Sequence, residues 1–152
     1  MRLRKSEITD IVEIRDLVLS LAHFFIEDKN TSLSSLSTLP MWLDESLKTT
    51  SFERRMLDRE YVHFVYVIDS EIVGYISIFG GNHIYHLFVS EAFQGRGIAR
   101  KLWNHARSEL PSTTYTVRSS MVAIPVYESF GFNITEPPSC KDGVRFQLMQ
   151  KA

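Results

Sequence analysis

The chain has 152 residues, of which 44% are hydrophobic and 23% are charged, which is typical of one folded globular domain and excludes wholesale disorder. The formal net charge is −1, so no overall basic field favours binding to nucleic acid or to anionic lipid. The single cysteine, Cys140, can form no disulfide within the chain, and we expect a reducing, cytoplasmic setting.

The sequence also predicts no membrane association. Its first ten residues lack the apolar run of a signal peptide. The most apolar segment, Leu17–Ile26, is too short to span a bilayer and contains Ser20 and His23. We expect that segment to form a buried helix of a soluble protein.

The first third of the chain predicts one short strand and two helices. Arg2–Arg4 alternates like a strand, and Thr9 or Asp10 can cap the helix that follows. Apolar residues at helical spacing in that helix are Ile11, Ile14, Val18, Leu21 and Phe25. A Ser/Thr-rich connection, Thr31–Pro40, leads to a weaker helical segment, Trp42–Arg59.

From Tyr61 onward the apolar period becomes that of strands. The segments Tyr61–Ile68, Ile72–Phe79 and His83–Val89 are rich in β-branched and aromatic residues. The turn-forming residues between them occupy positions 69–71 and 80–82. Three consecutive strands with such short turns predict an antiparallel meander.

The last third of the chain predicts one crossover and a closing strand. A helix over Gly97–Leu110 precedes a strand at Thr113–Val117, and Met121–Phe130 is helical. Phe146–Met149 is an edge or terminal strand. We therefore expect one α/β domain of the α+β type over residues 1–152, with a mixed, mostly antiparallel central sheet and helices on both faces.

A glycine-containing turn, Gln94–Arg100, joins the third strand of the meander to the next helix. It is not a G-x-G-x-x-G fingerprint, because Arg100 replaces the third glycine, and not a Walker loop, because Lys101 is followed by Leu102. Two interpretations stay open. Gly95 can serve a tight turn at positive φ, or the free N–H groups at the helix N-terminus can bind a phosphate, with Arg96 and Arg100 adding charge.

Two motifs in this order resemble a known family. Gln94–Ala99 is similar to the Q/R-x-x-G-x-G/A signature of the GNAT superfamily of N-acetyltransferases, with Leu87–Val89 as the end of the preceding strand. Ala123–Phe132 resembles the family segment A-x-x-Φ-Y-x-x-x-G-F, where Φ is apolar, and Asp69–Ile78 resembles its second and third strands. The resemblance covers Tyr61–Phe132 and implies the GNAT fold.

The resemblance also implies acetyl-CoA as co-substrate. In the family the backbone amides of the glycine turn hold the pyrophosphate, and a β-bulge splays the preceding strand so that its main chain pairs with the pantetheine arm. Carried over to this chain, the binding residues are Leu87, Phe88, Val89, Gln94, Gly95, Arg96, Gly97, Ile98, Ala99, Arg100, Ser120 and Tyr127.

Acetyl transfer to an amine needs a base for the amine proton, donors for the oxyanion and a proton for the leaving thiolate. By resemblance, Tyr127 is the general acid near the coenzyme sulfur. Two positions depart from the family pattern. Ser120 stands where an asparagine often bonds the pantetheine, and Tyr115 stands where some ribosomal-protein acetyltransferases carry a basic glutamate.

That second departure leaves the base open. His86 is the first candidate, because histidine titrates near neutral pH and His86 lies closest to the expected position of the thioester. His83, Glu91 and Glu128 are alternatives, and an ordered water is another. Cys140 is an incidental loop cysteine rather than an acetyl carrier, and the histidine spacing predicts no metal.

The sequence thus predicts an acetyl-CoA-dependent N-acetyltransferase that acts on a primary amine of a small molecule, peptide or protein in a ternary complex. The alternative is a non-catalytic acyl-CoA-binding sensor or regulatory domain of the same fold. The acceptor cleft is expected from Leu21–Arg59 and the chain after Phe132. We expect no nucleic-acid or membrane partner, and a homodimer is consistent with the family.

Overall fold

The structure, a computed structural model, describes residues 2–21, 45–141 and 144–152. The helical elements are η1 Ile8–Asp10, α1 Ile11–Ser20, α3 Thr49–Leu57, η4 Glu91–Phe93, α4 Ile98–Glu109 and α5 Ile124–Ser129, where η marks a short 3-10 helix. The strands are β1 Arg2–Lys5, β2 Tyr61–Ile68, β3 Glu71–Phe79, β4 His83–Val89, β5 Tyr115–Ser120, β6 Asn133–Ile134, β7 Ser139–Lys141 and β8 Val144–Lys151.

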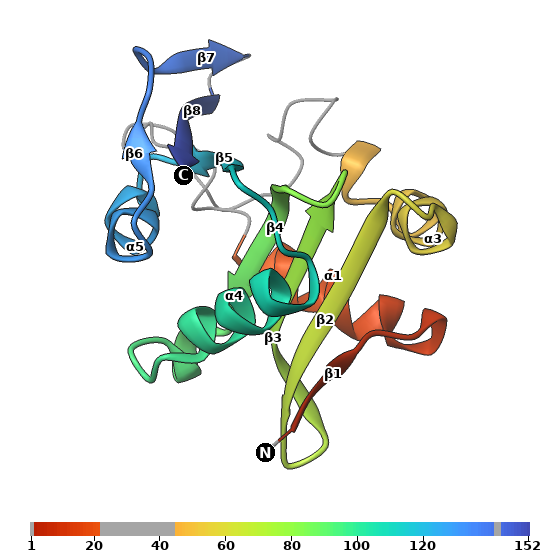
Figure 1. The fold of residues 1–152 in the computed structure, drawn as a ribbon. Helices are drawn as coiled ribbons and strands as arrows, with labels where there is room; N and C mark the ends of the chain where they lie inside the picture. The colour runs from red at the N-terminus through yellow and green to blue at the C-terminus, as the bar shows by residue number, and fades with distance from the viewer. Residues whose placement is uncertain (1, 22–44, 142–143) are drawn as a thin grey trace, which may run out of the picture.

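The strands form one sheet in the order β1-β2-β3-β4-β5-β8-β6, with β7 also paired to β8. Only the β4–β5 pair is parallel among the described pairs, and α4 provides the crossover between these two strands. Figure 1 shows α4 in front of the β2–β4 part of the sheet and α1 behind it. The structure therefore confirms the mixed, mostly antiparallel sheet with helices on both faces.

Each face of the sheet carries its own apolar core. On one face, Leu102 and Trp103 of α4 pack against strand residues such as Ile76. The approach of α4 to the sheet is close, because a Cβ added at Gly74 would lie 2.9 Å from Leu102 Cδ1. On the other face, α1 and α3 pack against Tyr75. The sheet is thus buried on both sides where β3 and β4 lead toward the glycine turn.

The antiparallel meander has the bounds expected from the sequence, except that β3 begins one residue early, at Glu71. Asp69 and Ser70 adopt positive φ values of 50° and 65°, which closes the first hairpin in two residues. Register shifts interrupt both ladders. These irregularities depend on strand pairing, so the composition of a single strand does not reveal them.

The N-terminal helix differs in its cap. Asp10 occupies the N-cap of α1, but its carboxylate accepts hydrogen bonds from the backbone N–H of Glu7 (2.7 Å) and from Arg4 (2.8 and 2.9 Å) instead of capping α1. The described part of α1 ends at Ser20, and the predicted helical position Phe25 lies outside the described residues. Of the predicted Trp42–Arg59 helix, residues 42–44 lie outside the described residues, Glu45 and Ser46 are helical, and α3 begins at Thr49 after the extended Lys48.

Three C-terminal predictions need correction. The strand predicted at 113–117 is β5, which extends to Ser120 because it pairs with β8 as far as Phe146. The helix predicted from Met121 begins at Ile124, since residues 121–123 form a turn. The closing strand, predicted as an edge or terminal strand, is β8, the terminal strand of the chain, which is not an edge because β6 and β7 pair with its outer side. Within the described ranges, no helix combines the length and apolar character needed to cross a bilayer.

Candidate functional site

The glycine turn presents a run of unbonded backbone donors. Gly95 and Gly97 both have φ of 80°, and Gly97 is the N-cap of α4. The first backbone bond into the helix runs from Lys101 N–H to Gly97 O, at 3.0 Å. Among the described residues, the backbone N–H groups of 95–100 donate no hydrogen bond. A nest of free donors at a helix N-terminus can bind an anion.

The space above this turn is open. A Cβ added at Gly95 or Gly97 would meet no atom within 4 Å. Packing therefore does not require glycine at either position, whereas the left-handed backbone does. The same bare backbone lets a ligand approach the amides without displacing a side chain.

The three polar side chains of the glycine turn make different contacts. Gln94 turns back, and its Nε2 donates to Val89 O at 3.0 Å, so it braces the end of β4 and leaves the amides free. Arg100 donates to Ser129 O at 3.1 Å from the α5 side of the site. Arg96 is exposed over the ring of Phe93 and does not line the cavity described next.

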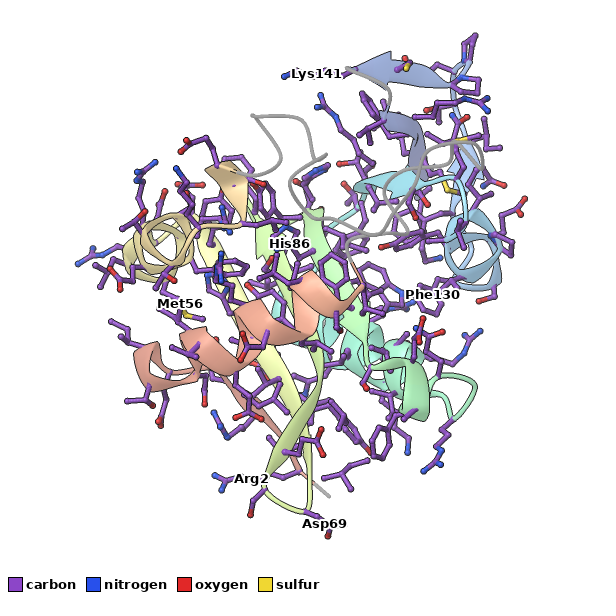
Figure 2. The ribbon with its side chains drawn as sticks, turned by 180° about the vertical axis from the view of Figure 1, so that it is seen from behind. Arg2, Met56, Asp69, His86, Phe130 and Lys141 are labelled. Atoms are coloured by element: carbon purple, nitrogen blue, oxygen red, sulfur yellow. The ribbon has the colours of Figure 1, made fainter. Side chains whose placement is uncertain are left out.

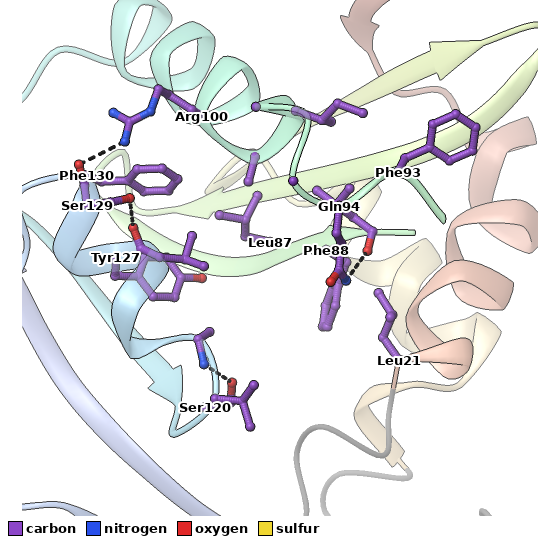
Figure 3. Close-up of a pocket in the computed structure, with 18 residues that line it drawn as sticks. Leu21, Leu87, Phe88, Phe93, Gln94, Arg100, Ser120, Tyr127, Ser129 and Phe130 are labelled. Carbon is purple, nitrogen blue, oxygen red and sulfur yellow. Dashed lines mark hydrogen bonds between the residues drawn. The ribbon is translucent and has the colours of Figure 1, made fainter. Parts of the chain in front are cut away.

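A cavity of about 560 Å³ lies between β4, the start of α4 and the β5–α5 connection (Figure 3). Of the predicted coenzyme-binding residues, every one except Arg96 lines it. The sequence analysis did not name the other lining residues as coenzyme-binding, and they are mostly apolar: Leu21, Phe93, Val122, Ala123, Val126, Ser129 and Phe130. Their apolar character alone carries no functional signal, because core residues look the same in the sequence.

The cavity exists because β4 leaves β5. The two strands pair only at His83–Thr116 and Ile84–Val117. On the other edge of β4, Ser77 pairs with His86 and Ile78 with Ile84, so Tyr85 is the extra residue of a bulge. Beyond the bulge, Leu87–Val89 line the cavity instead of pairing with β5. The expected bulge and splay are therefore present.

Tyr127 enters the cavity from α5. Its side chain is 6% exposed, and its ring packs against Phe130 and Phe132 with centroids 6.0 and 5.8 Å away. Its hydroxyl has no hydrogen-bond partner among the described residues. Burial raises the pKa of the phenol, so it stays protonated at neutral pH and can act as a proton donor. Figure 3 shows this ring on the α5 side of the cavity and Phe88 on the opposite side.

Ser120 is the last residue of β5 and lines the same cavity. Its Oγ accepts the N–H of Ala123 at 3.3 Å, which braces the turn before α5. The hydroxyl hydrogen remains available as a donor. Ser120 thus combines a local structural contact with a place on the cavity wall.

His86 lies on the opposite side of β4 from the α4 core, on the face that α1 crosses (Figure 2). Its ring contacts those of Phe52 and Tyr75, and it does not line the cavity. Its Nδ1 is buried with no hydrogen-bond partner among the described residues. Burial above all, with Arg55 and His63 as lesser causes, holds the pKa of His86 well below 6.5, so its ring is neutral at neutral pH.

The other base candidates are also outside the cavity lining. His83 Nδ1 lies 2.8 Å from Thr116 Oγ1, and burial lowers its pKa. Glu91 and Glu128 are exposed. Cys140 is exposed on β7, away from the cavity lining. No group of three or more His, Cys, Asp or Glu side chains in the described ranges could hold a metal ion.

Comparison with known proteins agrees with this architecture. The family model of the acetyltransferase (GNAT) domain matches residues 31–152. No curated protein matches the sequence significantly. Among solved structures, PaiA N-acetyltransferase from Thermoplasma acidophilum in complex with coenzyme A is similar at a TM-score of 0.74 and 15% identity, over 99% of this chain and 97% of that one.

Two further structures have the same fold. A GCN5-related N-acetyltransferase from Rhodopseudomonas palustris aligns at a TM-score of 0.79 and 18% identity, over 99% of this chain and 94% of that one. An aminoglycoside 6'-N-acetyltransferase complexed with coenzyme A aligns at a TM-score of 0.71 and 16% identity, over 99% of this chain and 96% of that one. These identities are low, so the likeness concerns the fold, and the family is shown by the sequence match.

Proposed function

Because the chain belongs to the acetyltransferase (GNAT) family, we propose that it transfers an acetyl group from acetyl-CoA to a primary amine, by direct attack in a ternary complex. The acceptor is an amine of a small molecule, peptide or protein. One juxtaposition carries the proposal. The cavity bordered by the unbonded amides of residues 95–100 also contains the free hydroxyl of Tyr127.

The residues of the cavity suit an acyl-CoA. The free donors of 95–100 match the acceptor oxygens of a pyrophosphate, and Arg100 adds a positive charge at the same end. Leu87–Val89 line the cavity and do not pair with β5, so this stretch of β4 faces the place where the amide-containing pantetheine arm would lie. That two of the similar proteins were solved with coenzyme A supports this assignment.

Tyr127 supplies the proton of the leaving group in this proposal. As the amine nitrogen forms its bond to the thioester carbon and the carbon–sulfur bond breaks, the thiolate receives the phenol proton. The raised pKa of Tyr127 keeps that proton in place until charge develops on the sulfur. No described residue competes for the hydroxyl by hydrogen bonding.

His86 is the proposed base for the amine proton. Its low pKa leaves the ring neutral, which is the form that accepts a proton. The ring lies 5.3 Å from that of Phe88, a wall residue of the cavity, but does not itself reach the wall. In this proposal a water molecule would carry the proton from the amine to His86.

The experiment is a thiol-release assay with acetyl-CoA and a broad panel of primary amines. We expect amine-dependent release of free CoA and a product heavier than the acceptor by one acetyl group. Replacing acetyl-CoA by longer acyl-CoA donors tests the acetyl assignment, and comparable rates would contradict it. Calorimetric binding of acetyl-CoA without thiol release from any amine would instead support a non-catalytic acyl-CoA-binding domain.

A further inference from the structure

A second cavity, of about 410 Å³, lies on the α3 side of the sheet. Arg55 of α3, Tyr61 of β2 and Tyr85 of β4 contribute to its wall. The two tyrosine rings meet edge to face, with centroids 5.3 Å apart. The cavity therefore combines an aromatic wall with a basic side chain.

Arg55 carries a buried positive charge without a negative partner. The residue is 7% exposed, and its guanidinium lies 4.6 Å from the ring centroid of Phe52 and 5.1 Å from that of Tyr85. Its Nη2 donates to Ser46 O at 2.8 Å, while Nε is buried without a partner. No described carboxylate forms an ion pair with it. A buried charge without an opposite charge nearby lowers the stability of the fold unless a negatively charged group pairs with it.

The acidic residues of the cavity are already engaged. Glu45 forms an ion pair with Lys48 Nζ at 2.8 Å, and Asp58 Oδ1 accepts the N–H of Glu60 at 2.9 Å. Counting Arg54 with Arg55, the wall has two formal positive and two formal negative charges, which sum to zero. This balance suits a single negative charge at Arg55 and disfavours a polyanion, which would also face both acids.

The second cavity and the coenzyme cavity are both bordered by residues of β4. Tyr85 lines the second cavity and Leu87 the first, and two residues of strand span about 7 Å. His86 lies between them, with its ring 4.5 Å from that of Tyr85 and 5.3 Å from that of Phe88. His86 itself lines neither cavity, so a small molecule held at Arg55 would reach the coenzyme cavity by extending over about this length of β4.

We infer that Arg55 binds a carboxylate of the acceptor, which makes the acceptor class small amines that also carry a carboxylate, that is, amino acids. This inference rests on the proposed acetyl transfer. The guanidinium keeps Nη hydrogens that no described residue accepts, and charge-assisted hydrogen bonds from them suit a carboxylate. The aromatic pair of Tyr61 and Tyr85 provides the apolar wall for the part of the molecule between its two polar ends.

The test compares amino acids of increasing chain length with their own carboxamides, which keep the amine and lose the negative charge. In the wild type we expect kcat/KM for thiol release to be at least tenfold higher for the best acid than for its amide, about the value of one charge-assisted hydrogen bond. In Arg55→Gln the ratio should fall to about one. Arg59→Gln, an exposed arginine outside the cavity wall, is the matched control and should keep the wild-type ratio.

Failure of this inference can be told from failure of the proposed function. Equal rates for acids and amides in the wild type would overturn the role of Arg55 and leave acetyl transfer intact. If neither the acids nor the amides release thiol, calorimetry on the CoA-saturated protein measures the binding of each class and decides whether Arg55 binds the carboxylate. Tighter binding of the acid, lost in Arg55→Gln, supports the inference, and equal binding of acid and amide overturns it. Should Arg55→Gln not fold, Arg55→Lys, which keeps the charge but not the fork, should lower the ratio severalfold.

Discussion

The ring of Tyr127 packs edge-on against the ring of Phe132, with centroids 5.8 Å apart, while the Tyr127 hydroxyl faces the cavity without a hydrogen-bond partner among the described residues. The ring is thus held by aromatic contacts and the hydroxyl is not used for folding. Stability and proton donation at this residue can therefore be separated by removing one oxygen atom.

Tyr127→Phe should lower kcat by about 100-fold, because the leaving thiolate loses its proton donor, and should change the KM for acetyl-CoA little. The melting temperature should stay the same. Steady-state kinetics and thermal unfolding measure both. An unchanged kcat would remove Tyr127 from the role of general acid.

Tyr115→Phe is the control for that variant. The Tyr115 hydroxyl accepts the N–H of Ser112 at 2.9 Å and donates to Leu110 O at 2.7 Å, and it does not line the coenzyme cavity. Losing it should reduce the free energy of unfolding by about 1 kcal/mol and leave kcat unchanged. Tyr127→Phe should thus lower kcat without lowering stability, and Tyr115→Phe should lower stability without lowering kcat.

Gly97→Ala should weaken CoA binding about tenfold, since a Cβ would stand where the pyrophosphate approaches the backbone. Gly81→Ala is a matched control, because Gly81 also has φ of 80° and open space around a Cβ but lies in the β3–β4 hairpin. Both variants should lose about 1–2 kcal/mol of stability from the left-handed strain. Calorimetric titration with CoA should separate them, and equal affinities would argue against a ligand at Gly97.

Ser120→Ala should raise the KM for acetyl-CoA about fivefold, the cost of one hydrogen bond of about 1 kcal/mol. Ser120→Asn, which restores the residue often found in the family at this position, should lower the KM instead. Kinetics with acetyl-CoA as the varied substrate distinguish the two. A KM unaffected by both changes would restrict Ser120 to its contact with the Ala123 N–H.

The stability of the fold should fall as the pH drops below about 6.5. The pKa values of His63, His83 and His86 are all lowered from 6.5, chiefly by burial. Below about pH 6.5 the unfolded chain therefore binds protons that the folded chain does not. This stabilises the unfolded state relative to the folded state. Above the unfolded value all three are neutral in both states, so their contribution is fully present.

Urea unfolding at a series of pH values measures this slope, and His86→Gln should flatten it whatever the variant does to stability at neutral pH. The slope, rather than the absolute stability, is the readout. A free energy of unfolding that rises on acidification would contradict the burial of these histidines.

Much of the fold could be predicted because the meander strands are rich in β-branched and aromatic residues and the glycine turn separates β4 from α4. The length of β5 could not, since its last residues are held by pairing with β8, a contact distant in sequence. The short strands β6 and β7 were missed for the same reason. Such pairings depend on the assembled sheet rather than on local propensity.

In the candidate site, too, some residues could be predicted from sequence motifs and others could not. The turn at Gly95–Arg100 and Tyr127 carry recognisable motifs, so their shared cavity followed from the resemblance. Arg55 carries none: beside Arg54 in the sequence it resembles a solvated helix face, and only packing against Phe52 and Tyr85 shows that its charge is buried. His86 was predicted as a base, but the sequence could not show which side of β4 it faces.

The crystal structure of the protein with CoA bound tests the central claim most directly. The account predicts pyrophosphate oxygens within hydrogen-bond distance of backbone nitrogens of residues 95–100, and the coenzyme sulfur beside the Tyr127 hydroxyl. A coenzyme bound elsewhere, or one whose pyrophosphate avoids these amides, would contradict it.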